Sequence, residues 1–332
     1  MQSVMSYASE KVSRLLTTMN KDAKIYVAGH SGMVGSAIVR ALEGAGFSQF
    51  LLRSSSELDL TNQNAVNVFF EKERPEYVFL SAAKVGGIHA NDVYPADFIR
   101  DNLLIQTNVI DAAYRNDCKK LLFLGSTCIY PKMAPQPIKE EYLLTGPLES
   151  TNEWYAVAKI AGLKMCAAYR KQHGFDAISV MPTNLYGPGD NFGLENSHVL
   201  PALMRRFHDA KVNSKDNVSV WGTGVPRREF LHVDDLADAV IFLMEHYSDE
   251  AAVNIGVGVD ISIKDVAEMV KEVVGFEGDL VFDKAKPDGT PRKLLDVSKL
   301  NKLGWFAKAP LNEGLQSTYQ WFLDHQENFR DV

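Results

Sequence analysis

The sequence is poor in cysteine, has no long apolar run and carries no excess of positive charge. Its three cysteines, Cys118, Cys128 and Cys166, form neither a C-x-x-C pair nor a zinc-binding pattern. We therefore expect no disulfide framework and no metal site, and we predict that the protein works in a reducing compartment, the cytoplasm. No apolar run approaches the roughly 18 residues of a membrane-spanning helix, so no membrane span is predicted.

The charge balance argues against a nucleic acid or an anionic membrane as partner. The 332 residues carry a formal net charge of −7, which leaves no basic field for a polyanion. A chain of this length can bury one large core or divide into two lobes. Residues 1–22 lack the hydrophobic core of a signal peptide, and we interpret them as a short N-terminal extension, with a weak transit peptide as the alternative.

A nucleotide-binding signature follows this extension. The run 24–28, which is apolar after Lys24, predicts a buried strand, and the next residues read GHSGMVG before a helical run begins at Ser36. In this G-x-x-G-x-x-G spacing, Gly29 permits a tight turn, Gly32 lets the backbone approach a diphosphate, and Gly35 allows close packing of the helix on the sheet. The order of strand, glycine turn and helix therefore predicts a dinucleotide site.

The end of the second predicted strand, 49–52, indicates which dinucleotide binds. Arg53, Ser54 and Ser55 follow this strand, at the place where NAD-binding proteins more often carry an acidic residue for the ribose hydroxyl. A guanidinium with neighbouring hydroxyls can hold a 2′-phosphate instead, which favours NADP(H). A polar loop with an exposed arginine remains the alternative.

Strands and helices then alternate with the period of parallel βαβ units. Strands are expected at 24–28, 49–52, 77–80, 121–124 and 177–181, and helices at 36–42, 63–73, 97–115, 151–173 and 311–325. This order predicts an α/β fold with a doubly wound parallel sheet of the Rossmann type. The predicted Rossmann domain comprises residues 23–182 and about 229–256, and a smaller, mostly C-terminal α/β substrate lobe comprises 183–228 and about 257–332. Ligands of such sheets bind at the carboxyl ends of the strands, so 81–84, 125–128 and 182–185 should line one crevice.

Tyr155 and Lys159 are four residues apart on the predicted helix 151–173, which places both on one face. An ammonium group beside a phenol favours the phenolate and lowers its pKa, so the pair suits proton transfer during hydride transfer. The spacing alone also occurs by chance on amphipathic helices, and it gains weight from the glycine turn upstream.

Three further side chains are candidates for chemistry. Ser126, at a strand end, can hydrogen-bond a substrate carbonyl, although a serine in a turn is commonly only a cap. Cys128 lies two residues further on, and a packed core thiol is its alternative interpretation. His198, at the expected start of a helix, could equally serve as a capping or packing residue.

Together these segments resemble one family, the GDP-L-fucose synthases, which are extended short-chain dehydrogenase/reductases. The resemblance runs from about Lys24 to the C-terminal helix. It is carried by GHSGMVG (29–35), SAAKVGGI (81–88), GSTCIYPK (125–132), YAVAK (155–159), MPTNLYGPGDNF (181–192), NSHVLPAL (196–203), WGTG (221–224), REFLHVDD (228–235) and KPDGTPRK (286–293). Cys128 and His198 make it specific, because the superfamily shares the glycine and Tyr/Lys motifs.

The resemblance implies a bifunctional enzyme that epimerises GDP-4-keto-6-deoxy-D-mannose at carbons 3 and 5 and then reduces the 4-ketone with NADPH. A Cys128 thiolate and a His198 imidazolium are a plausible base and acid pair for the two inversions. Tyr155 is expected to protonate the 4-oxygen, with Lys159 lowering the phenol pKa and binding the nicotinamide ribose. A homodimer through the long helices is the family expectation.

The same resemblance extends to the binding residues. The GDP-sugar contacts that it implies are Arg206, Trp221, Arg228 and Asp288, with a packed tryptophan and surface arginines as the alternatives. The cofactor contacts that it implies are Gly29, His30, Ser31, Gly32, Met33, Val34, Gly35, Arg53, Ser54, Ser55, Ala82, Ala83, Leu124, Gly125, Lys159, Pro182, Thr183, Asn184, Leu185 and His198. This chain departs from the family where members often carry arginine, at Ser31 and near Ser55, which makes 2′-phosphate binding, and with it NADP preference, depend on Arg53 and the serines that follow it.

Other functions on the same scaffold leave different signatures. A nucleotide-sugar 4,6-dehydratase should carry an Asp-Glu pair where this chain has Cys128 and Ile129, and a 4-epimerase has no need of Cys128 and His198. A non-catalytic NADP-sensing regulator would typically have lost Tyr155 or Lys159.

Overall fold

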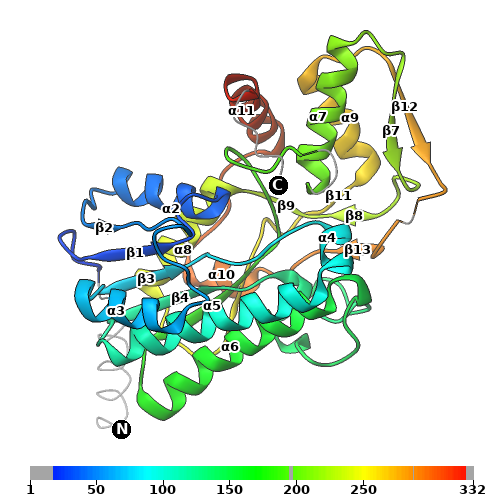
Figure 1. Ribbon diagram of the computed structural model, residues 1–332. Helices are drawn as coiled ribbons and strands as arrows, with labels where there is room; N and C mark the ends of the chain where they lie inside the picture. The colour runs from blue at the N-terminus through cyan, green and yellow to red at the C-terminus, as the bar shows by residue number, and fades with distance from the viewer. Residues whose placement is uncertain (1–17, 194–196, 287, 327–332) are drawn as a thin grey trace, which may run out of the picture.

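The computed structural model describes residues 18–193, 197–286 and 288–326 (Figure 1). The helices are α2 (Met33–Gly44), α3 (Gln63–Glu73), α4 (Ile88–Val93), α5 (Pro95–Arg115), α6 (Glu153–His173), α7 (Val199–Val212), α8 (Val233–His246), α9 (Ile263–Val274), α10 (Ser298–Leu303) and α11 (Leu311–Asp324). Short 3-10 helices are η1 (Thr127–Ile129), η2 (Glu140–Tyr142) and η3 (Ser150–Asn152). The strands are β1 (Ile25–Ala28), β2 (Phe50–Leu51), β3 (Tyr77–Leu80), β4 (Lys120–Leu124), β5 (Ala177–Pro182), β6 (Asn184–Tyr186), β7 (Asn217–Trp221), β8 (Arg227–Arg228), β9 (Phe230–His232), β10 (Val253–Ile255), β11 (Ile261–Ser262), β12 (Asp279–Asp283) and β13 (Arg292–Lys293).

A six-stranded sheet in the order β10-β5-β4-β3-β1-β2 forms the centre of the molecule. Every neighbouring pair in it is parallel. The residues of β1, β3, β4, β5 and β10 are all buried, as expected for strands covered on both faces. The predicted doubly wound Rossmann sheet is confirmed, and the five expected strands are present.

Two apolar layers cover this sheet. On one face α2 and α8 pack together over a core that includes Ile38, Leu42, Val240 and Leu243. On the other face α3, α5 and α6 lie side by side (Figure 1) over a second core around Phe70. The long helices α5 and α6 therefore form the outer wall of the second face.

The second lobe lies at the carboxyl end of the sheet, because β5 and β10 both lead from the sheet into it. It contains α7, α9 and α11, the strand pairs β12-β7 and β6-β9, and the three-stranded sheet β11-β8-β13. Its core includes Met204, Phe207 and Val270. The predicted lobe boundaries remain a prediction, but Leu300 and Trp305 pack in the core of α2 and α8, so the segment around α10 lies on the Rossmann core rather than in the second lobe.

Local sequence signals account for several helix ends. Asn62 caps α3 by accepting a hydrogen bond from the backbone of Ala65, and Ser262 caps α9 in the same way. Helices α6 and α9 end at Gly174 and Gly275, whose φ values of +68° and +71° favour glycine. Among the described residues, no helix is long and apolar enough to cross a membrane.

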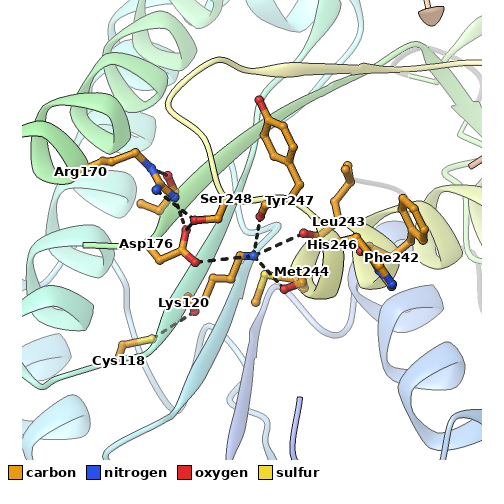
Figure 2. Close-up of polar contacts among 11 residues, drawn as sticks. Cys118, Lys120, Arg170, Asp176, Phe242, Leu243, Met244, His246, Tyr247 and Ser248 are labelled. Carbon is orange, nitrogen blue, oxygen red and sulfur yellow. Dashed lines mark hydrogen bonds and ion pairs between the residues drawn. The ribbon is translucent and has the colours of Figure 1, made fainter. Parts of the chain in front are cut away.

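A buried lysine ties the amino ends of β4 and β5 to the end of α8 (Figure 2). The Lys120 ammonium donates to the carbonyls of Met244 at 2.8 Å and Tyr247 at 2.5 Å, and it lies 3.6 Å from the Asp176 carboxylate. Asp176 in turn pairs with Arg170. Burial lowers the Lys120 pKa, while the Asp176 carboxylate opposes that shift. The cation thus satisfies carbonyls that the last turn of a helix leaves without partners.

We expect Lys120→Met to lower the free energy of unfolding by about 2–3 kcal/mol, because it leaves buried carbonyl oxygens without a donor. Lys119→Met is the matched control. The Lys119 ammonium is solvent-exposed and pairs with Glu76 at the surface, so its loss should cost less than about 1 kcal/mol. Urea unfolding of the two variants checks this, and equal stabilities would show that Lys120 contributes no more than a surface lysine.

Candidate functional site

The glycine turn between β1 and α2 has no room for a side chain at Gly29 or at Gly35. Gly29 has φ +84°, and a Cβ added there would meet the Ala82 backbone nitrogen at 2.8 Å. A Cβ on Gly35 would overlap the carbonyl of Gly29. The turn is therefore held against the loop after β3 and against its own helix by backbone contact alone.

The start of α2 has the features of an anion site. The first bond within the helix runs from the Ser36 N–H to the Gly32 carbonyl at 2.9 Å, so the N–H groups of the preceding three residues, Met33, Val34 and Gly35, have no helical partner. No side chain caps this end, and no acidic residue lies in the first turn. The buried Nδ1 of His30 also lacks a partner. These groups fit the diphosphate of a dinucleotide.

The turn after β2 differs from the sequence analysis in one respect. Arg53 and Ser54 lie where predicted, but both the backbone N–H and the hydroxyl of Ser54 donate to the carboxylate of Glu57, at 2.8 and 2.7 Å. Arg53 donates to the Leu52 carbonyl and pairs with Glu73 at 3.3 Å. A carboxylate in this turn was not expected from the sequence. Glu57 is three residues beyond Ser54, and only the turn brings it back.

The loops after β3, β4 and β5 meet beside the glycine turn. Ala82 contacts Gly29, and the Gly125 N–H donates to the Val180 carbonyl at 2.8 Å, which joins the ends of β4 and β5. The side chains of Thr183 and Asn184 both donate to the Glu229 carbonyl. The remaining predicted cofactor residues in these loops are Ala83, Leu124, Pro182 and Leu185, of which Leu124 and Pro182 end strands β4 and β5. The predicted convergence of strand ends is therefore present.

Tyr155 and Lys159 share one face of α6, as predicted. The Lys159 nitrogen lies 5.9 Å from the centre of the Tyr155 ring and donates to the Leu124 carbonyl at 2.8 Å. Phe98 contacts Tyr155 edge to face. Burial raises the pKa of Tyr155 above its ordinary value, so the expectation that Lys159 lowers it is wrong for the protein without ligands. The ammonium is directed to a carbonyl and not to the phenol oxygen.

Burial also lowers the pKa of Lys159 to about 8. The side chain is 3% exposed. An unfolded chain holds this proton up to a pH near 10.5, so between about pH 8 and 10.5 the unfolded state binds more protons and stability rises with pH. Below pH 8 the folded protein carries the full cost of a buried ammonium group.

Lys159→Met should therefore raise the free energy of unfolding at pH 7, by about 1–3 kcal/mol, while it impairs activity. The gain should shrink between pH 8 and 10, where the native lysine loses its proton. Urea unfolding of both proteins at pH 7 and pH 9.5 checks the prediction. A variant less stable than the native protein at pH 7 would mean that the ammonium is a net stabilising group.

Ser126 is the N-cap residue of η1, the short helix that follows β4, and Cys128 lies within η1. The Ser126 hydroxyl accepts a hydrogen bond from the Cys128 N–H at 3.2 Å, so it does act as a cap. The same hydroxyl lies beside the Tyr155 phenol and favours its ionised form, whereas a Cys128 thiolate would disfavour it. Cys128 is half buried, in contrast to the buried Cys118 and Cys166. Its interpretation as a packed core thiol is therefore not supported.

His198 directly precedes the first residue of α7. Its side chain makes no capping hydrogen bond, so its interpretation as a cap is not supported, and the residue is exposed. The surrounding protein nevertheless desolvates the imidazole and lowers its pKa. Among the described contacts, none joins His198 to Cys128 or Tyr155.

The predicted substrate residues gather around the end of β7. Trp221 is 56% exposed, with the Arg206 guanidinium 5.2 Å and the Lys286 ammonium 5.1 Å from its ring centre. A solvent-accessible indole beside two cations suits an aromatic base that carries phosphates. Lys286 was missed as a site residue, although it opens the KPDGTPRK segment.

Arg228 and Asp288 lie near this cluster. The Asp288 carboxylate accepts hydrogen bonds from the backbone N–H of Thr223 at 2.6 Å and from its hydroxyl at 2.8 Å. It also interacts with the charge of Arg228, whose pKa burial lowers. Asp288 thus stabilises the turn after β7. A ligand hydroxyl that donates to the Asp288 carboxylate would have to share its oxygens with Thr223. Among the described residues, no group of three His, Cys, Asp or Glu side chains is arranged to hold a metal.

Comparisons with known proteins identify the family of this chain. The profile of the NAD dependent epimerase/dehydratase family matches residues 25–256. Putative GDP-L-fucose synthase 2 of Arabidopsis thaliana is 67% identical over 307 residues, which cover 92% of this chain and 94% of that protein. GDP-L-fucose synthase of Escherichia coli K12 is 55% identical, with 92% and 98% covered. 

Among solved structures, a GDP-L-fucose synthetase from Naegleria fowleri bound to NADP has a TM-score of 0.88 at 32% identity, covering 96% of this chain and 99% of its own. A GDP-6-OMe-4-keto-L-xylo-heptose reductase from C. jejuni also reaches 0.88, at 42% identity, with 93% and 100% covered. The chain therefore belongs to the NAD dependent epimerase/dehydratase family and, within it, to the GDP-L-fucose synthases.

Proposed function

We propose that this protein converts GDP-4-keto-6-deoxy-D-mannose to GDP-L-fucose by epimerisation at carbons 3 and 5 and NADPH-dependent reduction of the 4-ketone. The observation that carries the proposal is the half-buried thiol of Cys128 beside the Tyr155 phenol and the Ser126 hydroxyl. Reduction alone needs no such thiol, whereas inversion next to a ketone needs a base.

The epimerisation follows from the acidity of protons alpha to a ketone. Their removal gives an enolate, whose oxygen the Ser126 hydroxyl and the Tyr155 phenol stabilise by hydrogen bonds. The high pKa of the buried Tyr155 keeps its proton in place as a donor at neutral pH. Cys128 removes a proton from one face of the sugar, and His198 returns one to the other.

The reduction uses the same residues in another role. Tyr155 gives its proton to the 4-oxygen, and Lys159 moves from the Leu124 carbonyl toward the phenol and the ribose of the nicotinamide. NADPH supplies the hydride when bound. The family and an NADP-bound relative indicate a nicotinamide cofactor, and Arg53 favours the phosphorylated form.

The nucleotide end of the substrate is placed between α7 and the end of β7. Trp221 stacks on the base, and Arg206, Arg228 and Lys286 compensate the diphosphate charge. We also propose that the protein is a homodimer, whose partner covers the outer faces of α5 and α6, and that it works in the cytoplasm.

The deciding experiment incubates purified protein with the keto sugar in deuterated water and with NADPH or NADH. Stoichiometric cofactor oxidation, deuterium at carbons 3 and 5, and GDP-L-fucose as product are expected. Reduction without deuterium at these carbons would identify a 4-reductase, and sugar inversion without net cofactor oxidation would identify a 4-epimerase.

A further inference from the structure

The Glu57 carboxylate accepts hydrogen bonds from the backbone N–H and the hydroxyl of Ser54, a residue predicted to bind the 2′-phosphate of NADP(H). In a Rossmann fold, the adenosine ribose lies between the glycine turn and the end of the second strand. Ser54, to which the Glu57 carboxylate is bonded, lies in the turn after β2. The protein's own carboxylate therefore lies where the ribose of a bound dinucleotide is expected.

The contacts of Glu57 match those that favour an anion. One oxygen accepts from both the N–H and the hydroxyl of Ser54, at 2.8 and 2.7 Å, and the Ser54 hydroxyl also lies 3.0 Å from that of Ser56. These bonds hold the pKa of Glu57 below its ordinary value, so it remains ionised at neutral pH. A phosphate must displace this carboxylate or bind beside a like charge.

Little positive charge is available at this turn to balance the negative charge of a 2′-phosphate. Arg53 is the predicted cation, and it already pairs with Glu73 at 3.3 Å. Ser31 and Ser55, the other predicted contacts of the cofactor, carry no charge. By contrast, a carboxylate in this place is a good acceptor for the free 2′-hydroxyl of NAD(H).

We propose that Glu57 is a specificity-determining residue that competes with the 2′-phosphate and narrows the preference of this protein for NADP(H) over NAD(H). This inference rests on the proposed use of a nicotinamide dinucleotide. In the free protein the Glu57 carboxylate occupies the anion site in the turn after β2. The 2′-phosphate of NADP(H) must displace this carboxylate in order to bind there.

The test is calorimetric titration of the native protein, Glu57→Gln and the control Glu268→Gln with NADP+, NAD+ and adenosine 2′,5′-bisphosphate. Glu268 is an exposed residue of α9 in the second lobe, so its variant carries the same net charge change. Glu57→Gln should tighten NADP+ and the bisphosphate by about threefold to tenfold, because it removes one like charge from the turn. NAD+ should bind unchanged or more weakly, and Glu268→Gln should match the native protein.

The titrations distinguish a failure of the inference about Glu57 from a failure of the proposed function. If the native protein binds dinucleotides but the ratio of NADP+ to NAD+ affinity in Glu57→Gln stays within twofold of the native value, Glu57 does not set specificity. Weaker NADP+ binding by the variant would overturn the inference too, because Glu57 would then support the turn. If the native protein binds neither dinucleotide, the proposed function itself fails.

Discussion

Tyr155→Phe is expected to abolish reduction of the 4-ketone while proton exchange at carbons 3 and 5 continues. The change removes only the phenolic oxygen, and the ring keeps its packing against Phe98. Without a proton donor the developing alkoxide is not neutralised, and the loss should reach about 10²–10⁴-fold. Exchange should fall far less, because Ser126 still stabilises the enolate oxygen.

The two activities are separated by following NADPH oxidation and, in deuterated water, deuterium incorporation by NMR. Tyr169→Phe is the matched control, because it removes a phenol from the same helix that bonds to Asp111 and lies away from the strand-end loops. Its activities should remain near the native values. Full reduction by Tyr155→Phe would exclude Tyr155 as the acid.

Cys128→Ser is expected to block epimerisation and leave direct reduction of the 4-ketone in place. A serine hydroxyl is far less acidic than a thiol and is a poor base at neutral pH, so inversion should slow by about 10²–10⁴-fold. Cys128 is half exposed and its backbone N–H is the group bonded to Ser126, so the substitution leaves that hydrogen bond intact. The product should be the 6-deoxy sugar with carbons 3 and 5 not inverted.

The measurement is identification of the product sugar by NMR after complete NADPH oxidation. Cys118→Ser serves as the control, because this buried thiol lies at the opposite, amino end of β4. It should change stability but not the product. Unchanged formation of GDP-L-fucose by Cys128→Ser would show that the thiol is only a packing group and would leave a reductase without the proposed base.

Local sequence patterns were sufficient to predict the strands, the glycine turn and the helices of the Rossmann sheet. The apolar run 24–28, the three glycines and the helix that follows obey short-range rules, and the structure has them as expected. The same holds for Tyr155 and Lys159, since a helical period alone places them on one face of α6.

Contacts between distant segments escaped these patterns. Asp288 reaches Thr223 across 65 positions of the chain. Lys120 reads as an ordinary charged residue beside a strand, yet it is buried against the end of α8, more than 120 residues away. Such contacts depend on which segments the folded chain brings together, and no local period encodes this.

The amino-acid sequence by itself determined the order of strands and helices, the glycine turn and the identity of the reactive side chains, because these depend on neighbours within a few residues. Only the tertiary structure decided their electrostatic state. Burial, which depends on the whole fold, raises the pKa of Tyr155, lowers that of Lys159 and directs its ammonium to the Leu124 carbonyl.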